Sequence, residues 1–134
     1  MNIFILAGEP SGDEYGAKLM QELTSINSNI SFSGIGGSLM EKQGLKSIAP
    51  FNQMSVMGFF EIIKTLPFFL KLEKNILKFL KDQKPEKVIL IDYPGLNLRL
   101  TPKIKSSIDT KIFYYISPQI WAWKEKRIEI IKKY

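Results

Sequence analysis

The 134-residue sequence contains neither cysteine nor histidine. Without cysteine it has no disulfide, no thiolate nucleophile and no thiolate metal site, which suits a reducing compartment. Without histidine it lacks the commonest general base and the commonest zinc ligand. Acid–base chemistry carried by this chain must therefore use mainly Asp or Glu, with Lys and Tyr as secondary choices.

Arginine is also scarce. Arg99 and Arg127 are the only two arginines, although the formal net charge is +6. The excess charge comes from lysine, which lacks the bidentate fork that arginine offers to bases and phosphates. This charge fits an anionic surface, such as acidic lipid, as readily as it fits nucleic acid.

Targeting and membrane-spanning segments are not indicated. The N-terminus has no basic region, and Glu9 and Asp13 come too early for the apolar core of a signal peptide. No stretch has the length of a transmembrane helix without a charge. With 45% hydrophobic residues the chain can form one core-bearing domain. We therefore expect a soluble or surface-bound globular protein.

Apolar strand patterns alternate with helical patterns along the chain. Alternation of this kind predicts an α/β fold, a Rossmann-like parallel sheet with helices on both faces. The predicted strands are 2–7, 30–35, 45–48, 87–91 and 111–116. The predicted helices are 13–27, 39–43, a long region from about 58 to 83 interrupted by Pro67, 96–107, and one from about 122. The chain ends inside this last, charged helix, which indicates a fragment of a longer protein.

The first strand ends in a glycine-rich turn, Gly8 to Gly12. One interpretation is a cradle for an anionic or hydroxyl-rich ligand at the carboxyl edge of the sheet. The other is a plain loop in which Ser11 or Gly12 caps the next helix. The turn has neither the dinucleotide fingerprint nor a Walker lysine, and Glu9 would repel a pyrophosphate. It therefore suits sugar hydroxyls better.

A second candidate turn begins at Asp92, directly after the apolar strand 87–91. Asp92 either caps the following helix or acts as a general base. An apolar strand end and neighbouring tyrosines would partly desolvate its carboxylate, which favours the second role.

The segment 55–72 is unusually apolar, and lysines within it and after it recur on one helical face. A core helix with a solvated edge is the ordinary explanation. The density of phenylalanine favours a surface that binds membrane or acyl chains, with lysines near the headgroups. The lysines are Lys64, Lys71, Lys74, Lys78 and Lys81. In segment 117–124, Trp121 and Trp123 either stack on a sugar or base or, as we favour, pack a loop.

Five motifs occur together in order: AGEPSGD at 7–13, GIGG at 34–37, MSVMG at 54–58, IDYPGLN at 91–97 and SPQIWAW at 117–123. With them the chain resembles the lipid-A-disaccharide synthase family over nearly its whole length. Pro10 and Tyr93 depart mildly from the family pattern, at positions that are not candidate catalytic groups.

The resemblance implies a two-domain glycosyltransferase of the GT-B type that needs no metal or cofactor. Such an enzyme transfers diacylglucosamine from its UDP derivative to the 6-hydroxyl of diacylglucosamine 1-phosphate. The anomeric centre inverts, the product is the β-1,6-linked lipid A precursor, and UDP is released. The implied partners are these two lipid-linked sugars and an anionic membrane surface, with no nucleic acid and with a homodimer of the full-length protein. The implied location is the cytoplasmic side of the inner membrane of a Gram-negative-type bacterium, as a peripheral protein.

The resemblance also assigns roles to residues. Asp92 would be the base, and Glu9 a second essential carboxylate that orients the acceptor or supports Asp92. Further substrate-binding residues would be Gly8, Ser11, Gly12, Asn97, Ser117 and Trp121. Acyl chains or membrane would contact Val56, Met57, Phe59, Phe60, Ile63, Phe68, Phe69 and Leu72. Residues 1–134 would form the N-terminal acceptor and membrane-binding domain, and the C-terminal UDP-sugar domain would lie outside this chain.

Two other functions compete with this one. A UDP-sugar hydrolase or epimerase would use a similar sheet edge, but the apolar, lysine-striped segment argues against a purely soluble substrate. A non-catalytic module that binds membrane surfaces would not need Glu9 and Asp92 at one edge. A flavodoxin-like electron carrier is disfavoured because its phosphate-binding turn is usually richer in Ser and Thr.

Overall fold

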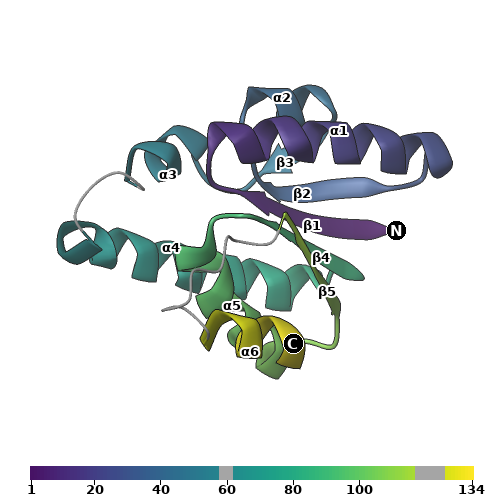
Figure 1. Ribbon diagram of the computed structural model, residues 1–134. Coiled ribbons are helices and arrows are strands. Elements are labelled where there is room, and N and C mark those ends of the chain that lie inside the picture. Colours follow the sequence, from purple (N-terminus) through teal and green to yellow (C-terminus); the bar gives the residue numbers. More distant parts are fainter. Residues whose placement is uncertain (58–61, 117–125) are drawn as a thin grey trace.

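A computed structural model of the chain describes residues 1–57, 62–116 and 126–134. In this part of the chain, five parallel strands form one sheet in the order β3-β2-β1-β4-β5 (Figure 1). The strands are β1 (Asn2–Ala7), β2 (Ser31–Ile35), β3 (Leu45–Ser47), β4 (Lys87–Ile91) and β5 (Lys111–Tyr115). The helices are α1 (Pro10–Ile26), α2 (Ser38–Lys42), α3 (Phe51–Met57), α4 (Ile62–Gln83), α5 (Pro94–Ser107) and α6 (Lys126–Lys133).

Helices cover both faces of the sheet, so the predicted Rossmann-like α/β class is confirmed (Figure 1). Side chains of β1 and β4 alternate between two cores, as expected of central parallel strands. Phe4 and Leu90 belong to the core under α4 and α5. Ile5 and Ile91 belong to the core under α1 and α2. The two continuous apolar strands therefore form the centre of the fold.

Helix α1 begins earlier than predicted, at Pro10 instead of residue 13. Helix α5 begins at Pro94, a residue well placed to open it, two residues before the span 96–107. Proline is favoured in the first turn of a helix because its ring presets φ and no intrahelical donor is needed there. In the described part of the chain, the N-cap residue of α1, Glu9, forms no side-chain capping hydrogen bond. The prediction that Ser11 or Gly12 caps this helix is therefore wrong, since both lie inside it.

The prediction that Pro67 interrupts the long helical region is also wrong, because α4 runs through it. Pro67 lies in the second turn of α4, so the helix continues past it without the one hydrogen bond that a backbone N–H would donate there. Further along the helix, Leu72, Ile76 and Leu80 are buried in the core and stabilise its docking. Among the described residues, no helix is long and apolar enough to cross a membrane.

An ion-pair cluster joins α4 to α5. The Glu73 side chain is 5% exposed, and its Oε2 lies 3.3 Å from a terminal nitrogen of Arg99. Lys103 Nζ donates a hydrogen bond to Glu73 Oε1. The cluster fixes how α5 lies on α4, and α5 in turn follows the Asp92 turn.

Candidate functional site

Glu9 and Asp92 are brought together at the carboxyl edge of the sheet. β1 and β4 pair in parallel with Ala7 opposite Ile91, so the turns that follow these strands are neighbours. Burial raises the pKa of the Glu9 carboxyl, and the nearby Asp92 carboxylate raises it further. Two carboxylates that influence each other at a sheet edge form an arrangement suited to acid–base chemistry. Their individual roles stay predictions.

The backbone at Asp92 and Tyr93 has an uncommon conformation, with φ values of 43° and 47°. Left-handed geometry at a residue other than glycine costs about 1–3 kcal/mol, and it persists where surrounding contacts impose it. Here Asn97 Nδ2 donates to the Asp92 carbonyl at 2.7 Å, and Tyr114 Oη donates to the same oxygen at 2.5 Å. The Asp92 N–H donates to the Tyr115 carbonyl at 3.2 Å. Neighbouring elements thus hold the turn on several sides.

Tyr93 connects this turn to the apolar segment. Its side chain is buried, and its hydroxyl donates to the Met54 carbonyl of α3 at 3.0 Å. Its ring centroid lies 6.2 Å from that of Phe69 on α4. Burial raises the pKa of Tyr93 to about 12, with a smaller contribution from Glu9. Tyr93 is therefore a neutral hydrogen-bond donor at physiological pH.

Gly8 and Gly12 pack against neighbouring elements and are buried. A Cβ atom at Gly8 would lie 2.6 Å from the Tyr93 ring, and one at Gly12 would lie 3.2 Å from the Ala7 Cβ. These two glycines allow close approach between elements. Their predicted contact with substrate stays a prediction. Ser11 is exposed in the first turn of α1, and its contact with the acceptor stays a prediction.

Asn97 does not line the surface. It is fully buried, and its amide donates to the Ile91 carbonyl at 3.3 Å as well as to Asp92. In this structure the side chain holds the turn that carries Asp92, and its contact with the acceptor stays a prediction.

The apolar segment is divided between core and surface. Leu72 is buried in the core, and its role in acyl contact stays a prediction. Phe68 and Phe69 are half-buried against the same core. Leu66 and Leu70, which the sequence analysis did not single out, are 37% and 47% exposed. Phe59, Phe60, Ser117 and Trp121, and the side chains of Val56, Met57 and Ile63, lie outside the described residues.

Sequence reasoning also missed Asp13 and Tyr114. The buried Asp13 carboxylate accepts backbone N–H groups from Gly37 at 2.8 Å, Met40 at 3.0 Å and Leu39 at 3.2 Å. Asp13 thus joins α1 to the start of α2. The sequence feature that could have indicated this contact is the Asp that ends motif 7–13 together with the glycines at 36 and 37. Tyr114 offered no signal, because a tyrosine in a strand is ordinary.

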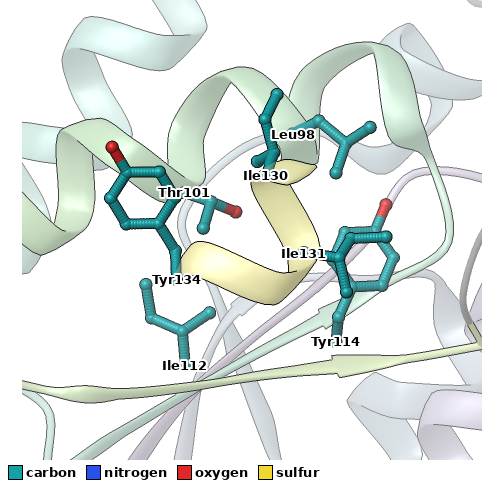
Figure 2. Close-up of a pocket in the computed structure, with 7 residues that line it drawn as sticks. All are labelled: Leu98, Thr101, Ile112, Tyr114, Ile130, Ile131 and Tyr134. Carbon is teal, nitrogen blue, oxygen red and sulfur yellow. The ribbon is translucent and has the colours of Figure 1, made fainter. Parts of the chain in front are cut away.

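A small pocket of about 170 Å³ lies between α5, β5 and α6 (Figure 2). Its lining is mostly apolar and includes Leu98, Ile130 and Ile131. Figure 2 shows Ile131 of α6 beside Tyr114. Tyr114 thus lines this pocket with its ring and contacts the Asp92 turn with its hydroxyl.

Comparisons with known proteins give a consistent result. The family model described as lipid-A-disaccharide synthetase matches residues 3–134. The chain is 45% identical over 130 residues to lipid-A-disaccharide synthase 1 of Legionella pneumophila (strain Paris), covering 97% of this chain and 34% of that protein. It is 42% identical over 133 residues to the lipid-A-disaccharide synthase of Francisella philomiragia, covering 99% of this chain and 35% of that protein. For the Coxiella burnetii (strain Dugway 5J108-111) enzyme of the same name the identity is 38%, with the same coverage.

The chain spans about a third of the length of these curated relatives. The match extends over both candidate turns and over all of the described sheet except Asn2. The chain belongs to the lipid-A-disaccharide synthetase family.

Proposed function

We propose that this chain is the N-terminal, acceptor-side part of a lipid-A-disaccharide synthase of the GT-B type. The whole enzyme would transfer diacylglucosamine from its UDP derivative to the 6-hydroxyl of diacylglucosamine 1-phosphate. The observation that carries the proposal is the Glu9–Asp92 pair at the carboxyl edge of the sheet, in a chain of this family. The donor nucleotide would bind in the part of the relatives' length that this chain does not cover.

The arrangement supports an inverting displacement. Asp92 would accept the proton of the acceptor hydroxyl as that oxygen bonds to the anomeric carbon, while the bond from that carbon to UDP breaks. Because burial and the Asp92 charge raise its pKa, the Glu9 carboxyl would stay protonated to a higher pH than an ordinary carboxyl. Glu9 would also orient the acceptor hydroxyls. Ser11 is exposed next to Glu9 and is available for the same task.

A hybrid enzyme tests this proposal. In it, this chain replaces the matching 130 residues of the Legionella pneumophila synthase. We expect disaccharide formation and UDP release within about tenfold of the parent enzyme, because imperfect packing at the new junction that raises the barrier by about 1.4 kcal/mol slows the reaction about tenfold. The 134-residue chain alone should give no transfer, since a base without a donor site cannot act.

Other outcomes would decide against it. A folded hybrid that makes no disaccharide contradicts the transferase proposal. Hydrolysis of the UDP-linked donor without any acceptor would favour the hydrolase alternative, and vesicle binding without either reaction would favour the binding module.

We further propose that the surface around Leu66 and Leu70 of α4 docks on an anionic membrane. The two leucines lie one helical turn apart and are exposed. The more C-terminal lysines of the same helix are exposed as well, namely Lys71, Lys74, Lys78 and Lys81. Exposed apolar side chains beside lysines are what a peripheral membrane helix presents to headgroups.

The double variant Leu66→Glu/Leu70→Glu should bind vesicles of anionic phospholipid at least about tenfold more weakly than the unmodified chain. Two half-exposed leucines contribute on the order of 2 kcal/mol when they enter the lipid, and the added carboxylates are repelled. Co-sedimentation with vesicles measures the effect. Leu39→Glu is the matched control, because Leu39 is 41% exposed but lies on α2 at the other face of the sheet. Equal losses in both variants would contradict this docking surface.

A further inference from the structure

The Asp92 turn is held by contacts that its own sequence does not supply. Asp92 and Tyr93 are consecutive residues with left-handed backbone, and neither is glycine. Isolated left-handed residues are common at turns, but two in succession without glycine need external support. Such support points to a role at functional sites, where strain positions a group.

Two side chains from different elements supply that support at a single atom, the Asp92 carbonyl oxygen. Asn97 reaches it from the first turn of α5 at 2.7 Å, and Tyr114 reaches it from the adjacent strand β5 at 2.5 Å. The carbonyl thus receives two donors, which fills its acceptor capacity. A turn fixed in this way cannot rotate its peptide without breaking both hydrogen bonds.

In this arrangement one polar atom of Asn97 is buried without a hydrogen bond to any described residue. Its side chain is fully buried, and its Oδ1 has no hydrogen-bond partner among the described residues. A buried amide oxygen without a partner is unfavourable, so the position of this residue is explained by what its Nδ2 does. That nitrogen donates to the carbonyls of Ile91 and Asp92.

We infer that Asn97 and Tyr114 are positioning residues of the transfer reaction, which hold the Asp92 backbone so that its carboxylate stays beside that of Glu9. This inference rests on the proposed function, in which Asp92 is the base. Displacement of a catalytic group by about 1 Å can lower the rate on the order of 10²-fold. A backbone that fixes the position of the Asp92 carboxylate therefore keeps the rate of transfer high.

Tyr114→Phe is the test variant and Tyr115→Phe its matched control. Both remove one hydroxyl from neighbouring residues of β5. Tyr114→Phe removes the hydrogen bond to the Asp92 carbonyl, whereas Tyr115→Phe leaves the backbone contact to the Asp92 N–H in place. Asn97→Ala, compared with Thr101→Ala one turn further along α5, is the second pair, because Thr101 bonds within the helix to the Asn97 carbonyl.

Two measurements are made. In the hybrid enzyme, Tyr114→Phe should lower kcat about 10-fold to 100-fold with less than about a threefold change in KM, because acceptor contacts are retained while the base is displaced. In the 134-residue chain, carboxyl NMR should show that Tyr114→Phe lowers the pKa of Glu9 part of the way toward its ordinary value. Burial, the larger cause of the raised pKa, remains, while the Asp92 charge, the smaller cause, moves away. Tyr115→Phe should change neither quantity.

If these residues had a merely structural role, the test variant and its control would both have lower thermal stability, and the pKa of Glu9 would stay unchanged. An unchanged Glu9 titration in Tyr114→Phe, or a kcat equal to that of Tyr115→Phe, overturns the inference. If the unmodified hybrid has no transferase activity, the proposed function fails, and the Glu9 titration still decides whether the two residues hold Asp92.

Discussion

Asp92→Asn in the hybrid enzyme should reduce kcat for disaccharide formation by about 10²-fold to 10⁴-fold, the range for loss of a general base. The amide has nearly the same shape as the carboxylate but cannot accept the proton of the acceptor hydroxyl. Asparagine also tolerates left-handed backbone, so the φ of 43° at this position is preserved. The loss should therefore come from chemistry and leave the fold unchanged.

The measurement is steady-state transfer with purified hybrid enzyme, together with thermal unfolding of the same variant. Asp82→Asn is the control, because Asp82 is an exposed carboxylate at the end of α4, away from the turn. The control should keep full activity. Near-normal transfer by Asp92→Asn would remove Asp92 from the role of base and leave Glu9 as the remaining carboxylate of the pair.

Gly34→Ala should destabilise the fold by at least about 3 kcal/mol, a loss reserved for substitutions with a clear steric cause. Gly34 lies in β2 with φ of +147°, a conformation that favours glycine. A Cβ atom there would lie 1.9 Å from the Ile5 carbonyl oxygen of the neighbouring strand β1. That oxygen belongs to the backbone of the central sheet, so relief requires the two strands to separate.

Urea unfolding followed by circular dichroism measures this effect, and two other glycines serve as controls. Gly95→Ala should be neutral or slightly stabilising, because Gly95 lies in the first turn of α5 with open space around it among the described residues. Gly44→Ala isolates the backbone contribution, since Gly44 has φ of +92° but similarly open surroundings there. Equal midpoints for Gly34→Ala and Gly44→Ala would show that the steric contact has no effect.

The residues of the family motifs thus serve two different physical purposes, namely packing and chemistry. Gly8, Gly12 and Gly34 allow elements to approach one another closely, and Asn97 holds a turn. Glu9 and Asp92 are the residues whose chemistry remains accessible at the sheet edge. Sequence reasoning assigned substrate contact to Gly8, Gly12 and Asn97 and did not show that they are buried, because a motif shows which residue types occur together and not which of them are buried.

The central strands could be predicted from the sequence almost residue by residue. β1 and β4 have the predicted bounds, because continuous apolar runs that end at a glycine or an aspartate leave little choice of register. The meeting of Glu9 with Asp92 also followed from order alone, because parallel strands place their carboxyl ends at one edge. The start of α1 was less predictable, since Pro10 extends this helix upstream of residue 13.

The hydrophobic pattern therefore determined the fold class, because that class depends on local periodicity and on strand order. The family and the roles of the two candidate carboxylates came from the resemblance that the five motifs carry. Only the tertiary structure decided which apolar residues of α4 face solvent, and that Asn97 and Tyr114 hold Asp92 while Tyr93 packs against Gly8. The physical reason is sequence separation. These contacts join residues from different elements, such as Tyr93 with Met54 or Tyr114 with Asp92, and no short-range pattern encodes such a meeting.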